Sequence, residues 1–174
     1  MFNLMRSLLF SRGSGNQKVL PGQDAPSYAS HAEKRGVSCL VVTGDLDFLA
    51  RIRRAANASD WKIWHALSFT DALETLRSEE IPMIVYDGDL GEDNWQYVLP
   101  RLNATAVHRC ILLASRVSDG YLWQEVLRHQ GYDILAKSVG QEQLIRTLQF
   151  AWDWRERLQY QGRAAKSRTS ADNR

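Results

Sequence analysis

The stretch SCLVVTGD, residues 38–45, sets the architecture of this chain. Its first six residues form a continuous run rich in β-branched side chains, which predicts a strand buried on both faces. Asp45 then stands where a helix N-cap is expected, ahead of apolar residues at helical spacing between Phe48 and Ala56. A buried strand followed at once by an amphipathic helix is typical of a parallel sheet that helices cover.

The same alternation recurs four more times along the sequence. Further strands are predicted at 61–66, 81–86, 110–114 and 132–136, and helices at 69–76, 97–102, 122–127 and 141–154. Five alternations predict an α/β protein with a five-stranded parallel sheet in the order 2-1-3-4-5 and helices on both faces. Cys39 and Cys110 fall on the first and fourth strands, which the third strand separates. We therefore expect two buried free thiols and no disulfide.

Both ends of the chain differ in composition from its middle. Residues 1–36 and 159–174 carry an excess of basic residues, are rich in small and polar ones, and show no sustained apolar period. Such segments cannot bury enough surface to offset their ordering entropy. The sequence therefore predicts disordered basic tails on either side of one ordered domain, 37–158.

Charge and hydropathy exclude several classes of protein. The 174 residues carry a formal net charge of only +2, too small for whole-molecule binding to nucleic acid, so no nucleic-acid partner is expected. No apolar run approaches the ~18 residues of a membrane helix, and the start of the chain is too interrupted for a secretory signal. We expect a cytoplasmic protein with no membrane partner.

Three chemically distinct side chains follow or end strands of the predicted sheet. Asp87 ends the third strand, Ser115 the fourth and Lys137 the fifth. In a doubly wound sheet, reactive groups gather outside the carboxyl ends of the strands. A carboxylate, a hydroxyl and an ammonium should therefore converge on one edge.

This order and spacing resemble the CheY-like receiver domain of two-component response regulators, a flavodoxin-like fold, over about residues 37–155. The resemblance implies that Asp87 accepts phosphoryl from a partner histidine kinase. It implies that Ser115 hydrogen-bonds the phosphoryl group and that Lys137 pairs with the phosphoaspartate. A carboxylate nucleophile needs such a cation and such a donor to stabilise the charge of an acyl phosphate.

The sequence departs from the receiver pattern at three places. Thr43 and Gly44 stand where receivers carry the acidic pair that holds Mg²⁺. The remaining candidate Mg²⁺ ligands are Asp87, Asp45 and Asp89, and the affinity should fall because Mg²⁺ demands near-octahedral oxygen ligands.

The other two departures lie on the fifth strand and after it. The family's Lys-Pro pair is Lys137-Ser138 here, which should leave the loop freer, and Ile134 replaces the aromatic switch residue.

Two functions follow from the resemblance. In the first, the chain is a stand-alone receiver-like signalling domain of a two-component phosphorelay that accepts phosphoryl on Asp87, but poorly. In the second, it is a pseudo-receiver, an adaptor that binds a kinase or another signalling protein without phosphorylation. Neither function makes it an enzyme. A flavin or other phosphate ligand is disfavoured, because 43–45 is too short for a phosphate loop.

A partner face is expected on the fourth helix, fifth strand and last helix, the usual output and dimer surface of receivers. Trp123 lies on the fourth helix, and Trp152 and Trp154 on the last. Residues two apart on a helix point about 200° from each other, so Trp154 should point outward if Trp152 is in the core. Trp154 is then either a binding residue, for a partner or a second copy of this chain, or lies flat under the C-terminal tail.

Overall fold

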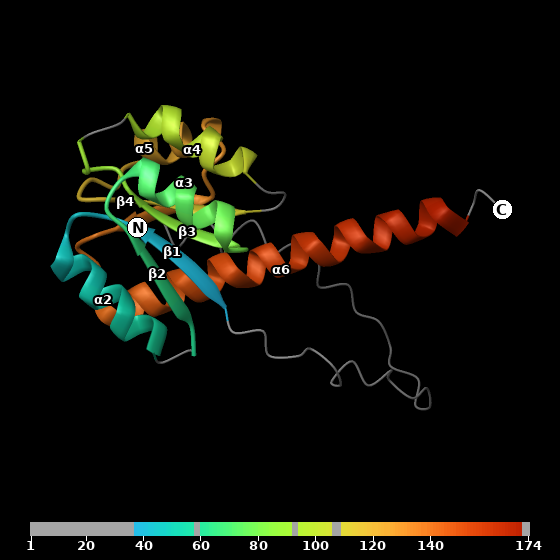
Figure 1. Ribbon diagram of the computed structural model, residues 1–174, viewed down its shortest axis with the longest axis horizontal. Coiled ribbons are helices and arrows are strands. Elements are labelled where there is room, and N and C mark those ends of the chain that lie inside the picture. Colours follow the sequence, from blue (N-terminus) through green and yellow to red (C-terminus); the bar gives the residue numbers. More distant parts are fainter. Residues whose placement is uncertain (1–36, 58–59, 92–93, 106–108, 172–174) are drawn as a thin grey trace, which may run out of the picture. The chain divides into compact units, whose positions relative to one another are not determined.

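The computed structural model describes residues 37–57, 60–91, 94–105 and 109–171, with side chains as far as Tyr160. Within these ranges it contains one sheet of five strands and five helices, labelled as in Figure 1. The strands are β1 (Ser38–Val42), β2 (Lys62–Ala66), β3 (Met83–Asp87), β4 (Cys110–Ser115) and β5 (Asp133–Ala136). The helices are α2 (Leu46–Asn57), α3 (Phe69–Ser78), α4 (Trp95–Ala104), α5 (Gly120–Arg128) and α6 (Gln141–Ala171).

The strands pair in parallel in the order β2-β1-β3-β4-β5, which confirms the predicted topology. The register aligns their carboxyl ends. Val42 pairs with Tyr86, and Asp87 pairs with Ala114. The residues that end or follow these strands therefore lie side by side along one edge.

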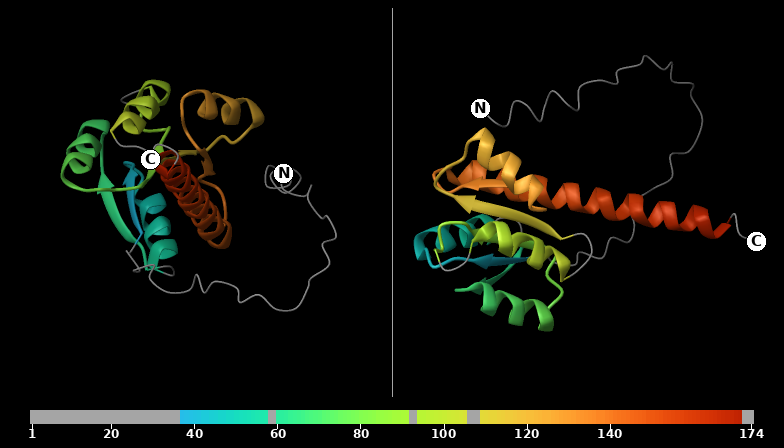
Figure 2. Two further views of the ribbon diagram at one scale, coloured as in Figure 1. Left: turned by 90° about the vertical axis from the view of Figure 1, so that its right-hand side faces the viewer. Right: turned by 90° about the horizontal axis from the view of Figure 1, so that it is seen from above.

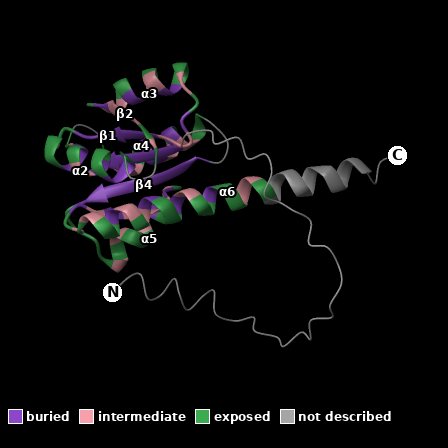
Figure 3. Cartoon of the chain, turned by 90° about the horizontal axis from the view of Figure 1, so that it is seen from below, coloured by how far each residue is buried: buried purple, intermediate pink, exposed green. Residues whose placement is uncertain are grey.

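Two apolar layers hold the sheet between the helices. On β1, Val41 packs in the layer under α2 and α6, whereas Leu40 and Val42 pack in the layer under α3, α4 and α5. Figure 2 shows α2 beside α6 on one side of the sheet and the other three helices across it. Because successive strand residues point to opposite faces, a sheet covered twice needs apolar residues at every position. The central strands β1, β3 and β4 are accordingly buried along almost all of their length, whereas the edge strands β2 and β5 are only partly buried (Figure 3).

The two cysteines lie on the same face of the sheet but do not touch. Cys39 pairs with Met83, and Met83 pairs with Cys110, so one strand separates the two thiols. Two strand spacings amount to about 10 Å, beyond the reach of a disulfide. Neither cysteine forms a disulfide and both are buried, as predicted. Burial, and to a smaller degree the charge of Cys110, raises the pKa of the Cys39 thiol, which keeps it protonated and inert.

The last helix is longer than the sequence predicted. The expected helix end near Trp154 and the disordered tail from residue 159 are replaced by helix as far as Ala171. The loss of an apolar period after Trp154 indicates that the helix no longer packs against the core, not that it ends. Residues 155–171 contain no proline and many good helix formers. The predicted N-terminal tail, 1–36, lies outside the described residues.

No helix in the described part of the chain, α6 included, combines the length and the apolar character that a bilayer crossing requires.

The junction between α5 and β5 differs in detail from its prediction. Gly131 follows the apolar positions of this helix in the sequence, and a glycine at that place predicts a helix stop. The structure ends α5 at Arg128 and gives the left-handed φ of 65° to Gln130. Gly131 is required for a different reason: a Cβ there would lie 2.4 Å from Val126 Cγ1 and 2.9 Å from Leu99 Cδ2. The absence of a side chain lets β5 begin directly against α5 and α4.

Candidate functional site

Four polar side chains are buried at the carboxyl edge of the sheet. Thr43 follows β1, Asp87 ends β3, Ser115 ends β4 and Lys137 follows β5. Asp87 is only 3% exposed and Lys137 8%. Buried charges persist only when they are paired and hydrogen-bonded, so the contacts of these residues describe what the site can do.

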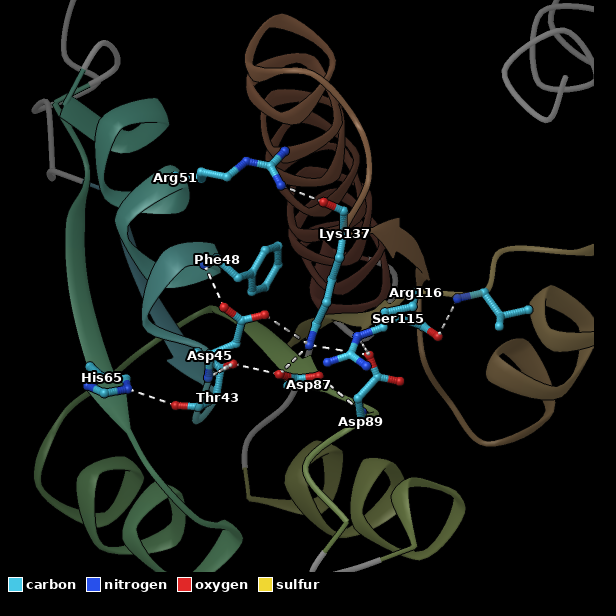
Figure 4. A network of polar contacts seen from close by, with 11 residues as sticks. Thr43, Asp45, Phe48, Arg51, His65, Asp87, Asp89, Ser115, Arg116 and Lys137 are labelled. Carbon is cyan, nitrogen blue, oxygen red and sulfur yellow. Dashed lines mark hydrogen bonds and ion pairs between the residues drawn. The ribbon is translucent and has the colours of Figure 1, made fainter.

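The Asp87 carboxylate accepts hydrogen bonds at both of its oxygens (Figure 4). Its Oδ2 accepts from Thr43 Oγ1 at 2.6 Å and from Lys137 Nζ at 2.7 Å. Its Oδ1 accepts from the backbone N–H of Asp89 at 3.0 Å. Three donors, one of them an ammonium, thus surround the predicted acceptor.

The Lys137 ammonium lies among three carboxylates. Besides Asp87, Nζ lies 3.3 Å from Asp89 Oδ2 and 3.7 Å from Asp45 Oδ2. The structure therefore brings together the three acidic residues that the sequence predicted as Mg²⁺ ligands. What lies between them is the ammonium of this chain's own lysine.

Asp45 has two roles at once. Its Oδ1 accepts from the backbone N–H of Phe48 at 2.9 Å, the N-cap contact that the sequence predicted at the start of α2. Its Oδ2 faces Lys137. The hydrogen bond from Phe48 is the main cause that lowers the pKa of Asp45 below its ordinary value; burial opposes it, and the charge of Lys137 adds a further lowering.

Thr43 is held in place by contacts with the loop that follows it and with the two strands beside β1. Its Oγ1 accepts from the backbone N–H of Asp45 at 3.0 Å while donating to Asp87. Its backbone carbonyl contacts His65 Nε2 at 2.9 Å. The sequence flagged Thr43 as the loss of an acidic residue and missed its role as a donor to Asp87. A polar β-branched residue next to a buried strand end was the available signal.

Ser115 lies at the carboxyl edge of the sheet, but its hydroxyl contacts the loop that follows β4. Its Oγ accepts from the backbone N–H of Val117 at 3.1 Å, a local turn contact. The adjacent Arg116 is exposed and places Nε 3.6 Å from Asp89 Oδ2. The predicted role of Ser115 toward a phosphoryl group stays a prediction.

A magnesium ion does not fit the donor set at this edge. Mg²⁺ takes hard oxygen ligands in near-octahedral geometry, and Thr43 and Gly44 supply no carboxylate. Oδ1 of Asp45 is committed to the cap, and Lys137 occupies the centre of the three carboxylates. Across the residues that the structure describes, no group of three acidic, histidine or cysteine side chains is arranged to hold a metal.

Comparison with solved structures establishes the fold. By sequence, no protein-family model and no curated protein matches this chain. By structure, it is similar to the chemotaxis response regulator CheY4 of Vibrio cholerae, with a TM-score of 0.62 at 15% identity, over 67% of this chain and 98% of that one. The fold is that of a CheY-like receiver domain.

Two further receiver structures agree. A CheY-like receiver domain protein from Methanospirillum hungatei JF-1 gives a TM-score of 0.63 at 13% identity, over 70% of this chain and 98% of that one. The signal receiver domain of an HD domain-containing protein from Pseudomonas fluorescens Pf-5 gives 0.65 at 19% identity, over 72% and 93%. The receiver fold therefore accounts for the path of the chain, and the site must be argued from this chain's own residues.

The two tryptophans of the predicted partner face are both partly exposed. Trp123 on α5 is 37% exposed and donates from Nε1 to Asp133 Oδ1 at 3.0 Å. Trp154 on α6 is 38% exposed, and its ring centroid lies 4.4 Å from that of Tyr132. Trp152, two residues earlier, is half-buried and packs against Trp61. The opposite orientation of the two α6 tryptophans follows the helical spacing.

Proposed function

We propose that this chain is a receiver-like signalling module that acts as an adaptor, binding a kinase or another signalling protein without phosphorylation of Asp87. The observation that carries the proposal is the donor pair on Asp87 Oδ2, with Thr43 Oγ1 at 2.6 Å and Lys137 Nζ at 2.7 Å. A hydroxyl stands where receivers have a metal-binding carboxylate. Asp87 then serves as the buried counter-charge of Lys137.

The chemistry of phosphoryl transfer supports this assignment. A carboxylate that attacks phosphorus needs a free lone pair and nearby positive charge to stabilise the transferred group. Asp87 already accepts three hydrogen bonds, and Lys137 is shared with Asp45 and Asp89. Lys137 is thus the cation nearest to Asp87 and is already neutralised by carboxylates.

A second candidate is slow acceptance of phosphoryl on Asp87 from a histidine kinase. The convergence of Asp87 and Lys137 within 2.7 Å favours it, with Ser115 at the end of the adjacent strand. In this case the site retains its nucleophile and its cation and has lost its metal ligands.

The partner surface that we propose is α5, β5 and α6. Trp123 and Trp154 are partly exposed there, and tryptophan is enriched among residues that carry binding energy. A second copy of this chain is a further candidate occupant of the same face.

Intact-mass measurement after incubation with acetyl phosphate and Mg²⁺ tests the assignment. We expect no phosphoryl adduct on the wild type and none on Asp87→Asn. The double variant Thr43→Asp/Gly44→Asp should restore metal affinity and labelling. The structure gives room for the substitution at position 44, because a Cβ at Gly44 meets nothing within 4 Å.

The outcomes separate the two candidates. An adduct on the wild type that disappears in Asp87→Asn overturns the adaptor and establishes the acceptor. An adduct that grows with the added carboxylates identifies the missing metal ligands as the cause of slow transfer.

A further inference from the structure

The turn that follows β5 carries Lys137 and lacks the proline of receivers. Its backbone is held by hydrogen bonds from Val139 N to Ala136 O at 3.2 Å and from Lys137 N to Ser115 O at 2.9 Å. Lys137 and Ser138 are the two central residues of this turn. A serine leaves the φ of the second one unconstrained, so another contact must fix the loop if Lys137 is to stay in place.

Arg51 of α2 supplies that contact. Its Nη1 donates to the backbone carbonyl of Lys137 (Figure 4). Its Nη2 donates to the backbone carbonyl of Val139, so one guanidinium binds the carbonyls on both sides of Ser138. The planar fork of an arginine suits two parallel acceptors, and its rigidity reduces the entropy lost per bond. In return, Gln141 Nε2 at the start of α6 donates to Arg51 O at 3.1 Å.

Residues at the start of α2 contact the ammonium end of the Lys137 side chain. Asp45 Oδ2 lies 3.7 Å from Nζ, and the Phe48 ring centroid lies 5.5 Å from it. Asp45, Phe48 and Arg51 are spaced three residues apart, which places them along one side of α2. Together they surround both the ammonium and the backbone of Lys137.

We infer that Arg51 is a positioning residue for Lys137, and that it takes over the restraint that a proline gives the loop in other receivers. By fixing the carbonyls of 137 and 139, Arg51 sets the direction in which the Lys137 side chain leaves the turn. That direction brings Nζ to Asp87. The inference concerns the placement of Lys137 and holds whether or not Asp87 is phosphorylated.

Pulse acetylation of lysine amines, followed by peptide mass spectrometry, tests this role. Lys137 is buried against carboxylates, whereas Lys62 on β2 is exposed and serves as an internal reference. Arg51→Ala should raise the ratio of Lys137 to Lys62 labelling by about tenfold, since two charge-assisted hydrogen bonds on the loop are lost. Arg51→Lys, which keeps the charge but not the fork, should give a smaller rise.

Two controls separate loop placement from general loss of structure. Arg54→Ala removes an exposed arginine from the same helix and should leave the ratio unchanged. A thiol reagent applied in parallel should leave Cys39 and Cys110 unmodified, because both are buried in the core.

A Lys137 ratio in Arg51→Ala equal to that of the wild type, with the thiols still protected, overturns the inference. If Arg51→Ala exposes the thiols, Arg51→Lys decides: a ratio above the wild type supports the role, and an unchanged ratio rejects it.

Discussion

Lys137 is one positive charge shared by three negative ones, and this imbalance has consequences for substitutions. Removal of the ammonium leaves Asp87 buried without its cation, close to two further carboxylates. Removal of the Asp87 charge leaves Lys137 with Asp45 and Asp89. The cluster should therefore tolerate the loss of an acid much better than the loss of its base.

We expect Lys137→Met to lower the free energy of unfolding by about 3 kcal/mol, the range found when one partner of a buried ion pair is removed. Asp87→Asn should cost about 1 kcal/mol or less, since the amide oxygen still accepts from Thr43. Urea unfolding of both variants gives the comparison. A larger loss in Asp87→Asn than in Lys137→Met would contradict this view of the cluster.

Asp45 gives the site a dependence on acid. Its pKa in the folded chain lies below the ordinary value of 3.8, so its carboxylate stabilises the fold at pH above about 4. That stabilisation is lost as the pH falls through the folded pKa, because the carboxyl group protonates. Asparagine keeps the cap but not the charge. We expect the wild type to melt at a higher temperature than Asp45→Asn at pH 7, and the difference to shrink as the pH falls below the ordinary pKa of 3.8 and through the lower folded pKa. A difference that does not change with pH would argue against this.

The sequence predicted the residues of the site better than their contacts. The meeting of Asp87 and Lys137 could be predicted from the sequence, because the strand ends of a parallel sheet share an edge. The role of Thr43 is not evident from the sequence, because the receiver pattern has a carboxylate at that position and the contact with Asp87 forms only in the folded sheet. Arg51 was missed because it acts on backbone carbonyls, which carry no residue-specific pattern. The spacing of Asp45, Phe48 and Arg51 was the only signal in the sequence.

Helices and strands were predictable where burial imposes a period. Segments rich in apolar, β-branched and aromatic residues identified all five strands, and Asp45 was recognised as a cap. The end of α6 could not be predicted in this way, because the exposed part of a helix needs no apolar side. The end of α5 at Arg128 was not predicted either, because Gly131, three residues later, has the stronger pattern of a helix stop.

The α5–β5 junction offers a test with a matched control in the same chain. Gly131→Ala forces a methyl group to within 3 Å of Val126 and Leu99, so we expect a loss of about 1–3 kcal/mol of unfolding free energy. Gly44→Ala meets open space and should change stability by less than about 0.5 kcal/mol. Thermal melting of the two variants checks this, and equal effects would show that the junction is not tightly packed.

For the molecule as a whole, the proposed partner face on α5, β5 and α6 can be tested at Trp154. We expect Trp154→Ala to weaken self-association or binding of a partner by about tenfold or more, as substitution of a tryptophan at an interface does. The loss of its contact with Tyr132 should lower the melting temperature only slightly.

Sedimentation and thermal melting of wild type and variant measure both effects. Tyr97→Ala, at an exposed position on α4, is the control for loss of an aromatic ring elsewhere. Unchanged association and partner affinity, or a collapse of the melting temperature, would remove Trp154 from the interface.

The length of α6 means that a small rotation at one end of the helix produces a large movement at the other. Over 31 residues the helix reaches about 45 Å, and more than half of it follows Ala151, its last residue in the apolar core. When a rigid helix is anchored near one end, the displacement of its other end is proportional to its length and to its angle of tilt. A tilt of a few degrees at Gln141, beside the turn that Arg51 holds, moves Ala171 by several ångströms. A rearrangement around Lys137 too small to disturb the sheet would thus be amplified at the far end of the helix.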